Sequence, residues 1–269
     1  MTKTNPVDRG ILLLDKPEEI TSMQCVERAK RMLGARKAGH SGTLDPKVTG
    51  LMLIAFNEAT KAMPVLIGMD KTYEGIMRIH GAFTSEQLSR AVRRFTGRIT
   101  QTPPRRSAVT RKPREREVFS FEVLSIDERD VAFRTTCEAG TYIRKLCHDI
   151  GESLGTGAHM ARLRRISIGP FSIGEAFILE QLETRRGECI FPLEHALERT
   201  GLPRAVVPEE CLERLRNGVP LELAELGLKT RPQGLFGLFD SKGTLLALAR
   251  MCENKAKPER VFNQSIQNK

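Results

Sequence analysis

Hydrophobic residues in the first half of the chain form short runs that predict β-strands. GILLLDKP is apolar up to the residues before Pro17, and LMLIAF at residues 51–56 is a continuous apolar run of strand length. KTYEGIMRIHG at residues 71–81 alternates apolar and polar positions, as a half-buried strand does. EVFSFEVLSI and DVAFRTTCEAG predict two more strands, joined by a turn at DERD.

Apolar positions spaced by three or four residues predict helices between these strands. The first helix begins at Thr21 or Ser22, whose hydroxyl can cap it, and runs to Leu33. A second opens with TSEQ at residues 84–87, which has the spacing of a capping box. Further helices are predicted near residues 59–66, in TYIRKLCHDIGESLG up to Gly155, and in PLEHALERT.

The character of the chain changes from about Thr184, where a charged connection leads into a tail of short strands. In that tail, GLFGLFDSKGTLLALARM consists of two apolar runs around DSKG, which is a hairpin signal. The pattern therefore predicts an α+β fold. A mixed-sheet domain covers residues 1–203, and a small β-rich domain covers residues 204–269.

Composition excludes several classes of protein. No apolar run approaches the roughly 18 residues of a membrane span, and MTKTNPVDRG lacks the apolar stretch of a signal peptide. We therefore expect an intracellular protein with no membrane partner. The six cysteines include no CxxC pair and the five histidines are dispersed, so no metal site is predicted. GxxxxGK[ST] and GxGxxG are absent, which leaves no motif for a nucleotide cofactor.

Charge indicates a polyanionic partner. The net charge is +10 and the isoelectric point is near 9.6. The basic side chains cluster in PPRRSAVTRKPRERE and MARLRRISIG, which predicts a loop that tracks phosphates. A basic surface that is merely solvated is the alternative. The clustered residues are Arg105, Arg106, Arg111, Lys112, Arg114 and Arg116, followed by Arg162, Arg164 and Arg165.

One carboxylate, Asp45, lies in the loop GHSGTLDPKVTG, whose glycines, proline and hydroxyl residues are typical of irregular structure. The apolar run that follows can hold such an acid rigidly. The chain has no tryptophan and two tyrosines, Tyr73 in KTYEG and Tyr142 in GTYIRKL. A core role is the default for a tyrosine. A flat ring with a polar tip also suits stacking on a flipped base.

These motifs carry a resemblance to a known family. KAGHSGTLDPKVTG, KTYEG, EAGTYIRKLCHDIG and GAHMARLRRISIGPF occur in the order found in TruB-type pseudouridine synthases. HSGTLDPKVTG and PPRRSAVTRKPRER resemble the dyskerin branch, the catalytic subunit of H/ACA ribonucleoproteins. The match runs from about Gly10 to Phe171, and the tail is more weakly similar to a PUA domain. The resemblance implies isomerisation of uridine to pseudouridine in RNA, with no cofactor.

The resemblance assigns roles to single residues. It implies that Asp45 either attacks C1′ as a nucleophile or removes the C2′ proton, within a desolvated pocket. Arg144 matches the arginine that pairs with this aspartate. Tyr73 matches the tyrosine that stacks on the base, with a candidate second role in removing the C5 proton. The remaining residues implied are Leu163 as an apolar pocket wall, Tyr142 as support for Arg144, His40 near the flipped nucleotide or as a structural residue, and Lys16 as structural support.

Two features depart from the family pattern. The family motif KPxGxTS reads KPEEITS here, so Glu19 stands at a customary glycine, and a turn with positive φ would have to differ. Few residues precede GILLLDKP, whereas relatives usually carry a longer segment that packs on the PUA domain. The resemblance therefore makes no prediction for how the tail domain is anchored.

The guided enzyme has two rivals. One is a stand-alone tRNA pseudouridine synthase that acts on the T-arm. The other is a non-catalytic RNA-binding scaffold, which the presence of Asp45, Tyr73 and Arg144 disfavours. The dyskerin branch implies an H/ACA guide RNA with rRNA and possibly tRNA targets. It also implies small protein partners: a glycine-arginine-rich subunit, a second small subunit and a kink-turn-binding protein. It would act in the cytoplasm of an archaeon or the nucleolus of a eukaryote.

Overall fold

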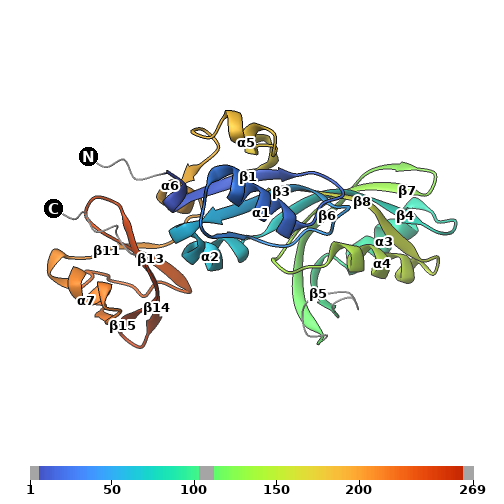
Figure 1. The fold of residues 1–269 in the computed structure, drawn as a ribbon. Coiled ribbons are helices and arrows are strands. Elements are labelled where there is room, and N and C mark those ends of the chain that lie inside the picture. The colour runs from blue at the N-terminus through green and yellow to red at the C-terminus, as the bar shows by residue number, and fades with distance from the viewer. Residues whose placement is uncertain (1–5, 103–111, 263–269) are drawn as a thin grey trace.

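The computed structural model describes residues 6–102 and 112–262, which form two β-sheets flanked by helices (Figure 1). The first sheet has ten strands in the order β10-β1-β3-β8-β4-β7-β6-β5, with β2 paired to β3 and β9 to β8. These strands are β1 (Gly10–Lys16), β2 (Ala38–His40), β3 (Thr49–Phe56), β4 (Lys71–Ile79), β5 (Gly97–Gln101), β6 (Arg114–Asp127), β7 (Asp130–Cys137), β8 (Ala158–Ile168), β9 (Phe171–Ser172) and β10 (Phe191–Pro192).

Helices begin where the sequence provides caps. Thr21 and Gln24 form a capping box before α1, and Thr84 and Gln87 form another before α3. The α-helices are α1 (Ser22–Leu33), α2 (Met63–Ile67), α3 (Ser85–Arg94), α4 (Ile143–Leu154), α5 (Gln181–Thr184), α6 (Leu193–Arg199) and α7 (Leu212–Arg216). Short 3-10 helices are η1 (Pro6–Arg9), η2 (Asn57–Ala62), η3 (Ile173–Glu175) and η4 (Glu209–Cys211). The described helices include none that is long and apolar enough to cross a membrane.

Successive side chains of β1 point to opposite faces of the first sheet, and each face has its own hydrophobic core. Leu12 and Leu14 pack with α1, α3 and α4, whereas Ile11 and Leu13 pack with η2, α2 and α6. The predicted mixed α+β architecture is confirmed. Within residues 6–102 and 112–262, the only parallel pairing between two strands of this sheet joins β3 to β8, at Thr49↔Arg164 and Gly50↔Arg165, and an isolated parallel bridge joins Leu14 to Phe177. That junction lies at the start of β3, directly after the loop that carries Asp45.

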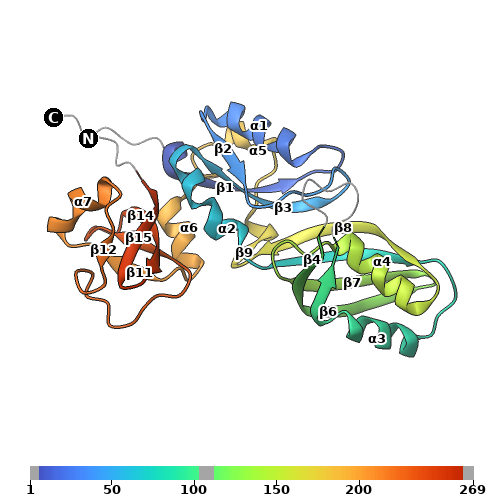
Figure 2. The ribbon, with the colours of Figure 1, turned by 90° about the horizontal axis from the view of Figure 1, so that it is seen from below.

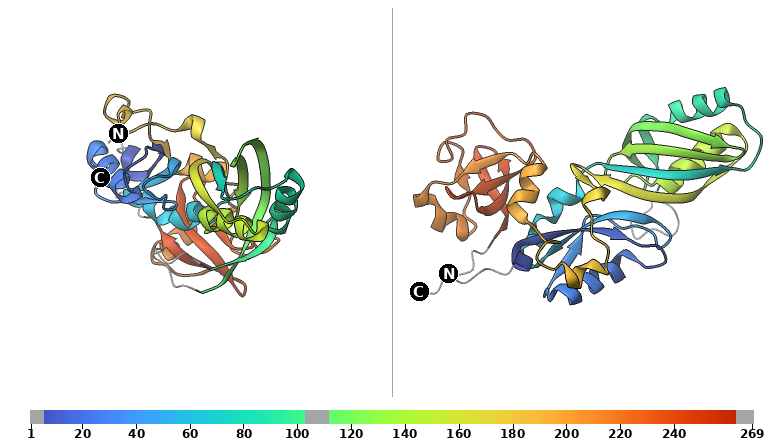
Figure 3. Two further views of the ribbon diagram at one scale, coloured as in Figure 1. Left: turned by 90° about the vertical axis from the view of Figure 1, so that its right-hand side faces the viewer. Right: turned by 90° about the horizontal axis from the view of Figure 1, so that it is seen from above.

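The second sheet has the order β11-β13-β14-β15-β12 and lies at one end of an elongated molecule (Figure 1). Helices α2 and α6 lie between the two sheets (Figures 2 and 3). The strands of the second sheet are β11 (Arg204–Val206), β12 (Leu221–Glu222), β13 (Leu235–Phe239), β14 (Leu245–Cys252) and β15 (Lys255–Val261).

The second sheet is held to the first by a shared apolar core. Phe239, Leu245 and Phe262 are buried in the same hydrophobic cluster as Ile11 and Leu13 of β1 and the β3 side chains on that face. Arg9, which precedes β1, adds polar contacts: its Nη2 donates to Glu194 Oε1 at 2.5 Å and to the carbonyl of Leu245 at 3.0 Å. The short segment before β1 therefore contributes to docking.

Candidate active site

The loop between β2 and β3 carries Asp45 and is anchored on both sides of this residue. The hydroxyl of Ser22 accepts from the amide of Leu44 at 2.8 Å and donates to the carbonyl of Leu44 at 3.0 Å. On the other side, Lys16 Nζ donates to the carbonyl of Pro46 at 3.0 Å. Both anchors come from KPEEITS, so the turn after β1 fixes the loop that holds the acid.

Lys16 is fully buried and acts as the centre of that turn. Its ammonium donates to the carbonyls of Pro17 and Ile20, both at 2.7 Å, besides Pro46. Burial lowers the pKa of Lys16, and nearby acidic groups, Asp45 among them, oppose that shift. Lys16 thus supports the loop, as the sequence predicted.

Glu19 adopts the backbone conformation that glycine favours. Its φ is +67°, and its amide donates to the carbonyl of Pro46 at 3.0 Å. The expectation that the turn must differ without a glycine is wrong, because Glu19 accepts a left-handed conformation to make this bond. Left-handed backbone costs a residue with a side chain roughly 1–2 kcal/mol.

Replacing this residue should therefore stabilise the protein. We expect Glu19→Gly to raise the free energy of unfolding by about 0.5–1 kcal/mol, because relief of strain outweighs the extra entropy of an unfolded glycine. Urea unfolding measures it. The control is Glu18→Gly, where φ is not positive and glycine should destabilise. Equal shifts in both variants would contradict the role of strain.

Arg144 reaches Asp45 from α4. Its Nη2 lies 2.6 Å from Asp45 Oδ2, and the two side chains are 46% and 47% exposed. Gln101 fixes the start of α4: its side chain accepts from the amide of Tyr142 at 3.0 Å and donates to the Tyr142 carbonyl at 3.2 Å. The described residues therefore do not enclose Asp45 in the desolvated pocket that the resemblance implied.

Tyr73 and Leu163 lie on neighbouring strands, β4 and β8, and are 8% and 9% exposed. Burial raises the pKa of the Tyr73 phenol, and the charge of Arg165 opposes that shift. Gly75, two residues after Tyr73 on β4, pairs with Leu163. A Cβ at Gly75 would lie 3.0 Å from the Leu163 side chain and 2.8 Å from the Phe133 ring. The two predicted pocket residues thus lie on one sheet region with no space for an extra side chain.

His40 is half-buried at the end of β2. Its Nδ1 accepts from the amide of Gly42 at 3.2 Å. Burial lowers the pKa of His40, and the positive charge of Arg165 lowers it further. The ring therefore acts as an acceptor within the loop, which fits the structural alternative, and its position near a flipped nucleotide stays a prediction.

Comparisons with known proteins identify the family that shares this arrangement. Residues 30–143 match the TruB family pseudouridylate synthase N-terminal domain, and residues 144–198 match the tRNA pseudouridylate synthase B C-terminal domain. A probable tRNA pseudouridine synthase B of Methanopyrus kandleri is 42% identical over 89% of this chain and 75% of its own length. Its Pyrococcus abyssi counterpart is 37% identical over 91% and 77%. The chain belongs to the TruB family of pseudouridine synthases.

Solved structures extend the likeness to the second sheet of this TruB family member. A crystal structure of a Cbf5-Nop10-Gar1 complex superposes with a TM-score of 0.84 and 34% identity, covering 96% of this chain and 86% of that one. A structure of an H/ACA ribonucleoprotein bound to a substrate RNA containing 2′-deoxyuridine gives 0.81 and 32%, with 96% and 86% coverage. The protein is an RNA pseudouridine synthase, and the dyskerin resemblance inferred from the sequence is confirmed.

Two arginines predicted to bind RNA have other partners in this TruB family enzyme. Arg164 Nη2 lies 2.6 Å from Asp15 Oδ2, and its Nη1 donates to the Thr49 hydroxyl at 3.3 Å. Arg165 is buried between strands and donates to backbone carbonyls, so the prediction that it contacts RNA is wrong. Both lie on β8, where a strand sends successive side chains to opposite faces.

The basic loop is only partly described. Arg105, Arg106 and Arg111 lie outside the described residues. Lys112 and Arg114 are exposed, and Arg114 begins β6 rather than lying in a loop. Their role in RNA binding stays a prediction.

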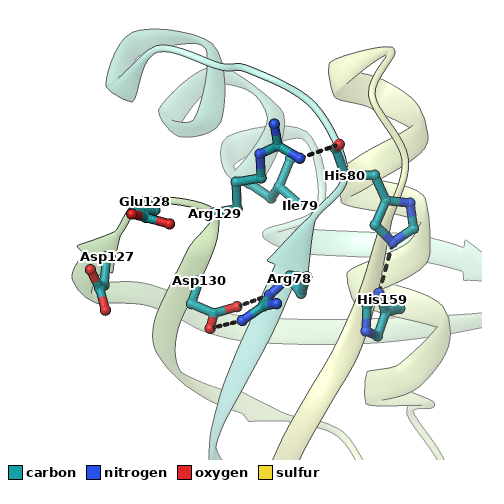
Figure 4. A pocket seen from close by; sticks show the side chains of 8 residues that line it. All are labelled: Arg78, Ile79, His80, Asp127, Glu128, Arg129, Asp130 and His159. Atoms are coloured by element: carbon teal, nitrogen blue, oxygen red, sulfur yellow. Dashed lines mark hydrogen bonds and ion pairs between the residues drawn. The ribbon is translucent and has the colours of Figure 1, made fainter.

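A cavity lies at the far end of β4 from Tyr73 and contains none of the predicted site residues (Figure 4). Its side chains bind one another: Arg78 pairs with Asp130, and His80 Nε2 lies 2.7 Å from His159 Nδ1. The cavity lies at the opposite end of β4 from Tyr73 and contains neither Asp45 nor Arg144, so it is separate from the candidate catalytic residues.

Sequence reasoning missed the residues that position the site. Ser22 and Gln101 each make a reciprocal pair of hydrogen bonds to one backbone residue, Leu44 and Tyr142. Gln101 is a polar residue in the apolar alternation before the basic loop, which is the one signal that could have singled it out. Ser22 carried no signal beyond helix capping.

Proposed function

We propose that this enzyme is the catalytic subunit of an H/ACA-type guided pseudouridine synthase, with Asp45, Arg144 and Tyr73 in its active site. The likeness to Cbf5 over 96% of the chain carries the proposal, because it includes the second sheet as well as the catalytic fold. That second sheet, from β11 to β15, would form the PUA-like domain proposed for residues 204–269, which would bind the guide RNA. The Cbf5-Nop10-Gar1 complex contains Nop10 and Gar1, so two such small subunits are the proposed protein partners.

The geometry supports a cofactor-independent mechanism. Asp45 is held by its anchored loop and is kept oriented by the guanidinium of Arg144. In that state the carboxylate can attack C1′ of the flipped uridine or remove the C2′ proton, and either route breaks the C1′–N1 bond. Tyr73 would stack on the freed uracil while it turns to present C5, with Leu163 as the apolar wall.

If base pairing with a guide RNA selects the target sequence, the protein itself needs to contact mainly the RNA backbone. Lys112 and Arg114 suit that role because they are exposed, and no ion pair between described residues includes either of them. Arg105, Arg106 and Arg111 belong to the same basic segment of the sequence.

We expect Lys112→Ala combined with Arg114→Ala to weaken RNA binding and to flatten its salt dependence. Each lost phosphate contact should reduce the slope of log K against log salt by roughly 0.7–0.9. Affinity measured across a salt series tests it. The control is Arg78→Ala combined with Arg134→Ala, two exposed arginines that already pair with Asp130 and Glu74. An unchanged slope in the first pair would mean that these residues face solvent.

A stand-alone tRNA enzyme is the second candidate, and the names of the curated relatives favour it. Those relatives are called probable tRNA pseudouridine synthase B, and they match 89% and 91% of this chain. Such an enzyme must recognise a folded tRNA arm with its own surface. The two candidates differ in what they need besides the substrate.

The discriminating experiment uses the full chain. Its activity is measured on a target oligonucleotide with and without a matched H/ACA guide and Nop10- and Gar1-type subunits, and separately on folded tRNA. The proposal expects conversion of the oligonucleotide only with guide and subunits. Conversion of tRNA by the bare protein, with no response to the guide, would replace it with the stand-alone enzyme.

Deletion of residues after Arg204 is a poor substitute for that experiment. The second sheet shares its core with β1 and β3, so a truncation would expose apolar residues of the catalytic domain. We expect the truncated chain to lose guided activity, but part of that loss would come from stability. Guide mismatches in the full protein separate the two causes.

A further inference from the structure

Arg165 occupies the point where the loop of Asp45, strand β3 and strand β4 meet. On β8 it is paired with Gly50 of β3 on one side and with Tyr73 of β4 on the other. Directly paired residues on adjacent strands send their side chains to the same face of the sheet, so Arg165 and Tyr73 share a face. Gly50 makes this approach possible, because a Cβ there would lie 2.3 Å from the Arg165 carbonyl oxygen.

The guanidinium of Arg165 connects two parts of the site. Its Nε donates to the carbonyl of Leu51 at 2.6 Å, and its Nη2 donates to the carbonyl of Gly42 at 3.1 Å. Gly42 belongs to the same loop as Asp45. One planar group therefore bridges the catalytic loop and the start of β3, on the strand position that pairs with Tyr73.

The charge of this group is buried without an acid to neutralise it. Arg165 is 1% exposed, and no ion pair within residues 6–102 and 112–262 includes it. Burying an unpaired cation costs several kcal/mol, whereas an apolar side chain of similar volume would fill the same space at no such cost. Packing alone does not account for an arginine here.

We propose that Arg165 is a positioning residue that holds the loop of Asp45 in one fixed arrangement beside Tyr73. The proposal rests on the proposed roles of Asp45 and Tyr73 in pseudouridine formation. Arg suits the position because its donors form a rigid planar fork, which lysine lacks. Arg165 does not touch substrate in this arrangement. It acts by fixing the backbone of the loop that orients Asp45 and the ring on which the base would stack.

The electrostatic effect of Arg165 gives the proposal an optical readout. Burial raises the pKa of Tyr73, and the positive charge of Arg165 opposes that shift. The chain has two tyrosines and no tryptophan, so Tyr142→Phe leaves Tyr73 as the single aromatic group whose phenolate absorbs. Phenolate absorbance then reports on Tyr73 alone, without any assay of activity.

The experiment compares Arg165→Gln and Arg165→Lys in the Tyr142→Phe protein. We expect Arg165→Gln to raise the titration midpoint of Tyr73, and Arg165→Lys to raise it less because the charge remains. The matched control is Arg134→Gln. Arg134 is an exposed arginine on β7, the other neighbour of the Tyr73 strand β4, and pairs with Glu74. An unchanged Tyr73 midpoint in both Arg165 variants would overturn the proposal.

Activity provides the second readout. In the otherwise unaltered enzyme, Arg165→Lys should slow single-turnover pseudouridine formation by about 10–100-fold, with RNA affinity within about twofold of the parent. A change in affinity alone, with the rate retained, would mean that Arg165 contacts RNA after all. If Asp45 and Tyr73 prove to have no catalytic role, the midpoint shift would still appear, so the two failures can be told apart.

A third measurement leaves Arg165 unaltered and tests the proposal even if the Arg165 variants do not fold. Tyr73→Phe removes only the hydroxyl and keeps the ring. We expect the Nε and Nη protons of Arg165, followed by NMR, to exchange with water faster in Tyr73→Phe than in the parent. Unchanged exchange and chemical shift would show that Tyr73 and Arg165 are not coupled, and would overturn the proposal.

Discussion

Asp45→Asn is expected to abolish pseudouridine formation, lowering the single-turnover rate by roughly 10⁴-fold or more, as loss of a nucleophile or base does. The amide has the shape of the carboxylate, so the anchored loop should keep its conformation. It can neither attack C1′ nor remove a proton from C2′. Because Asp45 contacts Arg144 rather than a phosphate-binding group, RNA affinity should stay within about twofold of the parent.

The control for this prediction is Asp130→Asn. Asp130 also pairs with an arginine, Arg78, but at the far end of β4. Its replacement should leave the rate unchanged, which separates loss of an ion pair from loss of the reacting group. Turnover by Asp45→Asn at the parent rate would remove Asp45 from the mechanism and leave the fold-level assignment intact.

Much of the fold could be predicted from the sequence because its signals are local. The capping boxes at Thr21 and Thr84 each require only four neighbouring residues, and both helices begin where they predict. The apolar runs of β1 and β3 predict strands for the same reason. The predicted turn at DERD also joins two strands: β6 ends at Asp127 and β7 begins at Asp130.

The positions of Arg164 and Arg165 could not be predicted in this way. The run AHMARLRRISI contains so many basic residues that its strand character is hidden. Whether an arginine on β8 faces water or the core depends on its register with β3 and β4, which are distant in sequence. Charge clustering therefore predicted an RNA contact for a side chain that is buried.

Backbone conformation was the other source of error. Glu19 occupies a left-handed position because its amide reaches Pro46, a contact made across the fold. The family resemblance identified the position, but a sequence pattern cannot tell whether a residue will accept the strain. The same limit applies to Lys16, whose three carbonyl partners include one that is distant in sequence.

Arg144→Lys is expected to slow pseudouridine formation by roughly 10²–10³-fold while the protein stays folded. Arg144 meets Asp45 through a single Nη2–Oδ2 contact of 2.6 Å, and the planar guanidinium fixes the direction of that contact. Lysine keeps the charge, but its flexible ammonium does not hold the carboxylate in one orientation. The rate loss should therefore come from orientation, and Arg144→Met, which also removes the charge, should be slower still.

Stability measurements distinguish this role from a structural one. Both partners are nearly half exposed, so the ion pair should contribute only about 0–1 kcal/mol to the free energy of unfolding. Arg78→Lys, at the ion pair with Asp130 at the far end of β4, is the matched control and should change neither the rate nor the stability by much. If Asp45 and Arg144 act as one unit, adding Arg144→Lys to Asp45→Asn should cost almost nothing further in rate. A loss of several kcal/mol in stability with the parent rate retained would make Arg144 a structural residue.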